Sequence, residues 1–286
     1  MDLVLMFSAD QYALIDFGGG EKLERFGDRT VRRETPSVDA GSANKNDWTC
    51  DAAFEKHYRS NAGQWESDSG PDDDWSIEHD GKRFLLKQAP SGQVGVFPEQ
   101  ATNWDWIERQ RESLIGLNAI NLFAYTGGTT MALAKCGVSV THVDAAKPAV
   151  AWARENAQAS GLGDAPVRWI VDDAVSFMKR EVKRGRQYQI IVADPPSFGR
   201  GPGKDVWKIQ RDIETLMELA SQLARDELKM FVISCHTPGY DADDLKQYAQ
   251  GHLKVRSGSA ETLELNLESQ SGATLHSGDC FRWCAG

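Results

Sequence analysis

The fold of this chain is decided by the stretch Ala119-Ile120-Asn121-Leu122-Phe123-Ala124-Tyr125-Thr126-Gly127-Gly128-Thr129. Its first half is an apolar run of the kind found in buried parallel strands. Gly127 and Gly128 then predict a turn, and the residues from Thr129 to Ala134 favour a helix. Because glycine has no Cβ, its backbone can adopt positive φ and let a ligand approach closely. A strand, a glycine turn and a helix N-terminus in this order predict a nucleotide or nucleoside site at the carboxyl edge of an open α/β sheet.

Strands and helices alternate after this stretch. Further strands are expected at 138–144, 167–171, 188–193 and 229–234, and helices at 148–159, 173–184, 206–225 and 240–250. Two β-like stretches, 261–267 and 280–284, end the chain with no helix between them. This pattern predicts the α/β class, with a doubly wound, mostly parallel, Rossmann-like sheet and an antiparallel C-terminal edge strand.

The first hundred residues have a different character. We expect short strands separated by glycine turns and by a polar loop, at 12–17, 30–33, 75–78, 83–87 and 94–97. An amphipathic helix is expected over 103–113. We therefore expect a small N-terminal β-rich subdomain, 1–100, followed by a second domain, 101–286.

The composition is that of an ordinary globular protein, with 286 residues, 41% of them apolar and 26% charged. No apolar stretch approaches the roughly 20 residues that cross a bilayer, and the N-terminus has no secretory pattern. We expect a cytoplasmic protein with no membrane contact. The net charge of −10 gives no long-range attraction to nucleic acid, so RNA binding would need a local basic patch.

The five cysteines are scattered and odd in number, which favours free thiols in a reducing compartment. Cys280 and Cys284 are four residues apart and would lie on one face of a strand. Two packed thiols are expected there rather than a zinc site, and no metal is expected elsewhere.

Acidic residues end the second and third strands of the predicted sheet. Asp144 comes 17 residues after Gly127, where a carboxylate can accept hydrogen bonds from both hydroxyls of a ribose. Its alternative role is to cap the next helix. Asp172 and Asp173 end the third strand, where one carboxylate could accept from an adenine amine and the other could cap a helix. We expect Asp173 to be the ligand.

The fourth strand ends in Asp194-Pro195-Pro196-Ser197-Phe198. Prolines fix the backbone and donate no hydrogen bond, so their carbonyls can accept from a substrate. The Asp194 carboxylate and a proline carbonyl form a rigid acceptor pair suited to an amino group or a nucleobase edge. Phe198 could stack on a base.

These residues resemble the class I S-adenosylmethionine-dependent methyltransferases, and more narrowly the branch related to bacterial large-subunit ribosomal RNA cytosine-5 methyltransferases. The matching motifs are Asn121–Gly128, His142-Val143-Asp144, Asp172-Asp173-Ala174 and Asp194–Phe198. Residues 14–20 and 22–27 also resemble members of this group. Glu99-Gln100-Ala101 stands where that family typically has Asp-Gln-Arg, and no clear counterpart of its N-terminal RNA-binding domain is visible.

The resemblance implies S-adenosyl-L-methionine as cofactor. The turn from Tyr125 to Gly128 would wrap its methionine end, Asp144 would take the ribose and Asp173 the adenine. The complete cofactor set that the resemblance implies is Phe97, Gln100, Phe123, Ala124, Tyr125, Thr126, Gly127, Gly128, Asp144, Ala145, Asp172, Asp173, Ala174 and Asp194. The catalytic set is Asp194, Pro195, Pro196, Phe198 and Cys235, with the loop after Asp194 facing the methyl acceptor.

Cys235 has two readings. Methylation at cytosine C5 needs a thiolate that adds at C6, and the resembling RNA branch carries its cysteine in a similar place. Alternatively, Cys235 is an inert thiol at a strand end. If the acceptor is a nitrogen, Asp194 and a proline carbonyl orient it and no covalent intermediate is needed.

Two sets of basic residues could meet a substrate. Lys179, Arg180, Lys183, Arg184 and Arg186 favour a solvated helix end. Arg200, Lys204, Lys208 and Arg211 follow the Asp194 loop and are better placed to contact phosphate. Gly199, Gly201 and Gly203 predict that the loop of this second set is mobile, as a lid would be.

We therefore expect a methyltransferase that transfers a methyl group from S-adenosylmethionine by in-line displacement to a base of RNA, on an rRNA-like substrate. One alternative is an NAD(P)-dependent Rossmann oxidoreductase, but Gly127-Gly128 is not followed by the Gly-x-Gly-x-x-Gly pattern. A methyltransferase acting on a protein or a small molecule, and a cofactor-binding protein without catalysis, are further alternatives.

Overall fold

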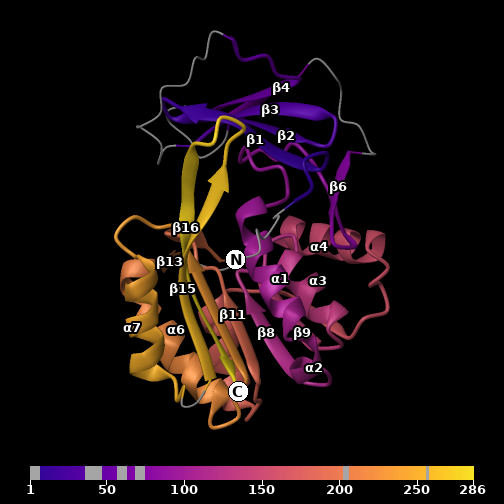
Figure 1. The fold of residues 1–286 in the computed structure, drawn as a ribbon. Helices are drawn as coiled ribbons and strands as arrows, with labels where there is room; N and C mark the ends of the chain where they lie inside the picture. The colour runs from indigo at the N-terminus through magenta and orange to yellow at the C-terminus, as the bar shows by residue number, and fades with distance from the viewer. Residues whose placement is uncertain (1–6, 36–46, 57–62, 68–74, 202–205, 256–257) are drawn as a thin grey trace. The chain divides into compact units, whose positions relative to one another are not determined.

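The structure is a computed structural model, and it describes residues 7–35, 47–56, 63–67, 75–201, 206–255 and 258–286 (Figure 1). The chain divides into two compact units. The N-terminal unit comprises Met1–Thr102 and Asn266–His276, and the C-terminal unit comprises Asn103–Leu265 and Ser277–Gly286.

The C-terminal unit is built on a seven-stranded sheet with the order β10-β9-β8-β11-β14-β16-β15. Its strands are β8 (Asn118–Leu122), β9 (Ser139–Asp144), β10 (Val167–Val171), β11 (Ile190–Ala193), β14 (Met230–Cys235), β15 (Gly258–Glu268) and β16 (Thr274–Ala285). The first five strands in this order are parallel, and β16 runs antiparallel to β14. The predicted α/β sheet with an antiparallel C-terminal edge is therefore confirmed.

Helices cover both faces of this sheet (Figure 1). They are α1 (Ala101–Arg109), α2 (Arg111–Leu114), α3 (Gly128–Lys135), α4 (Lys147–Ala159), α5 (Ala174–Lys183), α6 (Ile209–Ala224) and α7 (Ala242–His252). Apolar side chains of β8, β11 and β14 form one core with α5, α6 and α7. Residues alternate between faces along a strand, so Ile120 and Leu122 enter this core while Asn121 between them faces α3.

A short hairpin stands where a mobile glycine lid was predicted. β12 (Phe198–Arg200) pairs antiparallel with β13 (Val206–Lys208), directly before α6. Gly203 and Lys204 of the predicted loop lie outside the described residues. The backbone hydrogen bonds of the hairpin hold the two described ends of the loop together.

The N-terminal unit contains a five-stranded sheet with the order β1-β2-β3-β4-β5 and a separate hairpin of β6 and β7. The strands are β1 (Tyr12–Gly18), β2 (Glu21–Phe26), β3 (Arg29–Glu34), β4 (Ala52–Lys56), β5 (Gly63–Ser67), β6 (Ser76–His79) and β7 (Lys82–Leu85). A strand predicted at 94–97 was wrong, because Gly95 adopts a φ of 105° and breaks the extended backbone. The short 3₁₀ helix η2 (Pro98–Gln100) follows that segment.

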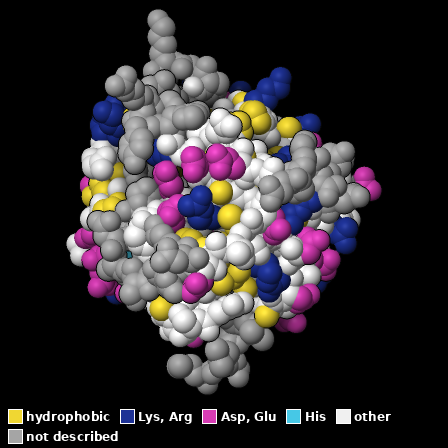
Figure 2. Space-filling view, turned by 90° about the horizontal axis from the view of Figure 1, so that it is seen from above, with side chains coloured by type: hydrophobic (Ala, Val, Ile, Leu, Met, Phe, Trp, Pro, Cys, Tyr) yellow, Lys and Arg dark blue, Asp and Glu magenta, His cyan; other side chains and the backbone are white. Residues whose placement is uncertain are grey.

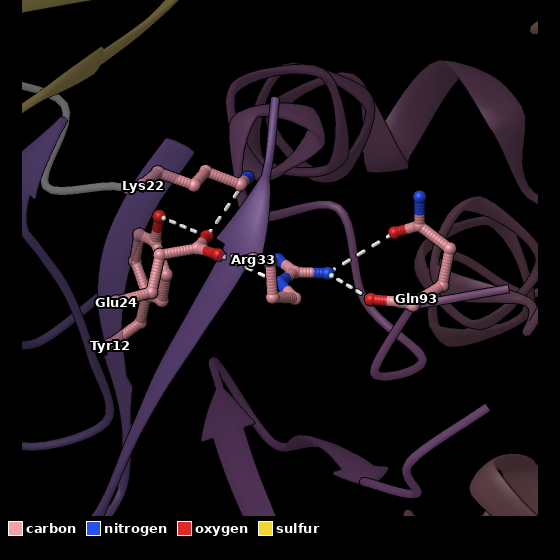
Figure 3. A network of polar contacts seen from close by, with 6 residues as sticks. Tyr12, Lys22, Glu24, Arg33 and Gln93 are labelled. Atoms are coloured by element: carbon pink, nitrogen blue, oxygen red, sulfur yellow. Dashed lines mark hydrogen bonds and ion pairs between the residues drawn. The ribbon is translucent and has the colours of Figure 1, made fainter. Parts of the chain in front are cut away.

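A network of charged side chains is buried within this unit (Figure 3). The Glu24 carboxylate accepts from Arg33 at 2.6 and 2.9 Å and from the Tyr12 hydroxyl at 3.0 Å, and Lys22 lies 3.1 Å away. On its other side Arg33 donates to Gln93 at 3.2 Å. Burial raises the pKa of Glu24, but Arg33 and Lys22 outweigh it and the net shift is downward. The carboxylate is therefore charged and paired at neutral pH.

No helix in the described part of the chain combines the length and the apolar character needed to cross a membrane.

Candidate functional site

The sheet register brings the predicted site residues of the C-terminal unit to one edge. Ala193 of β11 pairs with Leu122 of β8, and Leu122 pairs with Val143 of β9. Val143 in turn pairs with Ile170 of β10. Since these strands are parallel, Asp144 at the end of β9 and the residues that follow the other strands, Phe123, Asp172 and Asp194, all lie at the carboxyl edge of the sheet.

The turn after β8 has an unusual backbone. Phe123 and Tyr125 adopt positive φ values of 55° and 47°, and Gly127 adopts 88°. Left-handed backbone is uncommon for aromatic residues, and such strained positions concentrate at ligand sites. Gly127 is the N-cap of α3 and meets the left-handed requirement without a Cβ.

Glycine at 128 is required for a different reason. A Cβ added there would lie 2.3 Å from Cζ2 of Trp104, which is closer than any real contact. The Trp104 indole in turn donates to the Thr129 hydroxyl at 3.1 Å. The indole of α1 therefore lies directly against the start of α3.

Asp144 holds the turn in place. One carboxylate oxygen accepts from the Tyr125 N–H and the other from the Ala146 N–H, each at 2.8 Å. Burial raises the pKa of Asp144, and the two backbone hydrogen bonds oppose the shift without cancelling it. The N-cap of α4 is Ala146 and carries no side-chain cap, so Asp144 does not fill the alternative capping role. Its neighbour Ala145 continues the same edge.

A buried polar network lies beneath this turn, and sequence reasoning missed most of it. Asn121 of β8 donates to the Thr130 hydroxyl of α3 at 2.9 Å, and Thr130 contacts Nδ1 of His142 at 2.9 Å. Burial and Arg154 lower the pKa of His142 to about 3, so the ring is neutral. Polar residues inside otherwise apolar strands were the available sequence signal, because an orphaned polar group there would be costly.

A second missed residue supports the turn from α4. Asn156 is fully buried and donates to the Thr126 carbonyl at 2.9 Å. Thr126 and Ala124 of the turn are themselves buried. Asp144 therefore holds the Tyr125 N–H of the turn, and Asn156 holds the Thr126 carbonyl.

Asp172 and Asp173, which follow β10, have different contacts from those predicted. Asp173, chosen as the ligand, is the N-cap of α5 and accepts from the Ser176 N–H at 2.8 Å. Asp172 forms an ion pair with Arg180 and accepts from the Asp173 N–H at 2.9 Å. Ala174 is the first residue of α5 and is buried. The capping role thus falls on Asp173 and leaves Asp172 as the second acidic group of this edge.

The Asp194 carboxylate is held by Ser234, near the end of β14, and by His236, which follows that strand. Its Oδ1 atom accepts from the Ser234 hydroxyl at 2.7 Å and lies 3.5 Å from Nε2 of His236. Burial raises the pKa of Asp194, but the charge of His236 and the hydrogen bonds from His236 and Ser234 outweigh it and lower the pKa. Asp194 is therefore ionised at neutral pH.

The rest of the loop is tied down as well. The Pro196 carbonyl accepts from the Trp207 indole at 2.6 Å, so one of the two predicted proline acceptors already has a hydrogen-bond partner within the protein. Ser197 shares a hydrogen bond of 2.8 Å with Thr237. Pro195 is buried, whereas the Phe198 side chain is 45% exposed. An exposed aromatic ring at this position can stack on a base.

Cys235 is almost completely buried at the end of β14. Burial, with smaller contributions from Asp194 and Asp279, raises the pKa of this thiol, although its hydrogen bonds with Thr237 oppose the shift. The thiolate required for covalent catalysis is disfavoured in this arrangement.

The predicted basic residues are placed unevenly. Lys208 and Arg211 are exposed beside the hairpin, and Arg211 pairs with Asp212 at 2.7 Å. Arg184 pairs with Glu181, as Arg180 does with Asp172. Lys204 lies outside the described residues. Figure 2 shows a few Lys and Arg side chains among Asp and Glu side chains on the face that it draws.

Two predicted cofactor residues belong to the N-terminal unit. Phe97 is the N-cap residue of η2, and Gln100 is its last residue and is buried.

Cys280 and Cys284 are buried free thiols on β16. Among the described residues, no three His, Cys, Asp or Glu side chains are grouped to hold a metal ion.

Comparison with known proteins identifies the family. The family model for S-adenosylmethionine-dependent methyltransferases matches residues 28–225. A crystal structure of a SAM-dependent methyltransferase from Agrobacterium tumefaciens is 30% identical, with a TM-score of 0.87, and the match covers 96% of this chain and 91% of that one.

Two curated relatives are ribosomal RNA methyltransferases. Ribosomal RNA large subunit methyltransferase K of Neisseria meningitidis is 28% identical over 68% of this chain and 55% of its own length. The large subunit methyltransferase K/L of Shewanella frigidimarina is 36% identical over 47% of this chain and 18% of its own length. The chain thus matches only part of each relative. With a family model that matches most of its length, the chain belongs to the S-adenosylmethionine-dependent methyltransferase family.

Proposed function

We propose that this protein transfers a methyl group from S-adenosylmethionine to a base of RNA, with ribosomal RNA as the substrate class. When bound, the cofactor supplies a methyl group already activated by a sulfonium. The protein has to hold donor and acceptor in line and to exclude water. A cytoplasmic location is part of the same proposal.

The residues of the carboxyl edge fit this cofactor. The left-handed turn from Phe123 to Gly128 presents backbone groups without bulky side chains at its two glycines. Asp144 offers a carboxylate for the ribose hydroxyls, with its position fixed by Tyr125 and Ala146. Asp172, Asp173 and Ala174 are the candidates for the adenine.

The observation that carries the acceptor assignment is the ionised, anchored Asp194, with the exposed Phe198 four residues later in the chain. A carboxylate held by Ser234 and His236 can accept from an exocyclic amine, and the exposed Phe198 ring offers an apolar surface on which a base could stack. The burial and raised pKa of Cys235 favour this non-covalent route over attack by a thiolate. An amino group or ring nitrogen is therefore the acceptor that we propose.

The RNA substrate is supported by the relatives, two of which are named as large-subunit ribosomal RNA methyltransferases. Exposed Lys208 and Arg211, close in sequence to the Asp194 loop, could contact phosphate. The oxidoreductase alternative is not supported, since the family match is to methyltransferases.

The test is methyl transfer from radiolabelled S-adenosylmethionine to ribosomal RNA purified from cells that lack this gene. We expect label in the RNA with the wild-type protein and none with Asp194→Asn, and nucleoside mass spectrometry should locate the methyl group on a base nitrogen. Label in protein or small molecules but not in RNA would overturn the substrate assignment. A fully active Cys235→Ala variant would support the non-covalent route.

A further inference from the structure

The imidazole of His236 lies between two hydrogen-bond acceptors. Its Nδ1 atom contacts the Ser277 carbonyl, and its Nε2 atom lies 3.5 Å from Oδ1 of Asp194. A ring nitrogen can donate to an oxygen only when it carries a proton, so the doubly protonated imidazolium can donate at both contacts, whereas a neutral ring can donate at only one. The Asp194 charge stabilises that form, because an opposite charge nearby favours the charged state of a histidine.

The backbone of β16 is shaped to receive this ring. Gly278 adopts a φ of 142°, and a Cβ there would lie 2.7 Å from Nδ1 of His236 and 2.9 Å from the Cys235 carbonyl oxygen. Any side chain at this position would therefore force the imidazole or the Cys235 backbone to shift. This close approach is a second, independent sign that the position of the ring is specified.

Asp279 and Tyr240 are the other ionisable groups near Cys235, and neither supplies a positive charge to Asp194. Asp279 of β16 pairs across the strands with Cys235, and its negative charge acts on that thiol. Tyr240 also interacts electrostatically with Cys235. Of the groups around Asp194 that are described here, Ser234 supplies a neutral donor and His236 supplies a positive charge.

We propose that His236 is a positioning residue for methyl transfer, which as an imidazolium holds the Asp194 carboxylate oriented toward the methyl acceptor. When pH rises above the pKa of His236, the proton leaves Nε2 for solvent, since Nδ1 stays bonded to the Ser277 carbonyl. The lone pair of Nε2 then faces the carboxylate, the contact is lost, and activity falls. This inference rests on the proposed role of Asp194.

The protonation state can be measured without any substrate. In the full-length protein, ¹⁵N NMR of labelled histidines, with His236 assigned by its loss in His236→Gln, should give a pKa that falls by about one unit or more in Asp194→Asn. An unchanged pKa in Asp194→Asn would overturn the pairing.

Methyl transfer tests the positioning role. His236→Gln keeps a neutral donor near the Nε2 position, and we expect kcat to fall about tenfold or more and to lose its decline at high pH. His236→Asn places its amide only near the Nδ1 position and should be less active than His236→Gln. The affinity for S-adenosylhomocysteine and the KM for S-adenosylmethionine should stay unchanged in both.

The matched control is His252→Gln on α7, whose ring pairs with Glu214 at 3.0 Å and which belongs to no part of the proposed site. It should keep the wild-type kcat and pH profile. A wild-type profile in His236→Gln would overturn the proposal. If the wild-type protein methylates no RNA, the proposed substrate fails instead, and the NMR titration still decides the pairing.

Discussion

Single side chains at the sheet edge carry two functions at once. Asp144 fixes the turn through two backbone N–H groups and is also the proposed ribose ligand. A carboxylate oxygen has two acceptor positions, so the internal bonds leave capacity for a ligand. The same residue therefore couples the shape of the turn to the affinity for the cofactor.

We predict that Asp144→Asn weakens S-adenosylhomocysteine binding by about 1.5–3 kcal/mol, the range for hydrogen bonds to a charged group. An amide oxygen can serve only one of the two backbone N–H groups, and the ribose loses a charged acceptor. Isothermal titration calorimetry measures the change. Asp164→Asn, at an exposed turn, is the control and should bind as the wild type does. Equal affinity in Asp144→Asn would remove the ribose assignment.

Sequence predicted where the acidic residues lie but not which atoms they contact. Asp144 and Asp194 could be placed at strand ends because apolar runs precede them. Asp173 caps α5 through one hydrogen bond from the Ser176 N–H. Asp172 and Asp173 are adjacent and of the same residue type, so the sequence alone could not show which of them caps the helix. The burial of Cys235 and its raised pKa come from packing between β14 and its neighbours, which no local pattern encodes.

Helix α3 depends on close contact with α1 at its first residue. Because a Cβ at 128 would lie 2.3 Å from the Trp104 ring, we predict that Gly128→Ala destabilises the protein by about 1–3 kcal/mol through overpacking. The displaced turn should also bind S-adenosylhomocysteine more weakly. Urea unfolding and calorimetry measure the two effects.

Two further variants separate the contact from helix propensity. Trp104→Phe removes the atom that clashes, so Gly128→Ala should cost less in that background than in the wild type. Gly251→Ala in α7 meets no atom within 4 Å and should be neutral or stabilising. A Gly128→Ala protein as stable as the wild type would contradict the packing argument.

Elements with strong patterns were predictable and irregular ones were not. β10 was predicted with its observed bounds, Val167–Val171, because turn residues flank a short β-forming run. The residues 94–97 look equally β-like, yet the φ of Gly95 breaks the strand. The β12–β13 hairpin escaped prediction because its strands are three residues long and are joined through a glycine-rich loop.

The stability of the molecule as a whole should depend on the buried charges of its N-terminal unit. The pKa of Glu24 is lowered in the folded state, so its contribution is present above its ordinary pKa of 4.5 and is lost as pH falls through the folded value. Glu24→Gln leaves Arg33 buried without its counterion. We predict a loss of about 3–5 kcal/mol at neutral pH, as for other broken buried pairs.

Urea unfolding of the wild type and of Glu24→Gln at pH 7 and at pH values below 4.5 measures this dependence. The difference between the two proteins should shrink in acid, because the wild-type carboxyl then becomes protonated. Glu66→Gln, at an exposed position of β5, is the control and should follow the wild type at every pH. A pH-independent difference would show that lost packing, rather than charge, accounts for the effect.

The N-terminal unit closes with a segment from near the other end of the chain. The Leu14 carbonyl accepts from the Gln270 N–H at 3.0 Å, a partner synthesised 256 residues later (270 minus 14). At about 5–20 residues per second, a ribosome needs roughly 13–51 s to make that interval. During this time Leu14 of β1 lacks its hydrogen bond from Gln270, while the strands of the C-terminal unit are synthesised. A fragment that ends at Thr102 would lack the segment Asn266–His276, which belongs to the N-terminal unit. A premature stop before Asn266 would therefore leave both units incomplete.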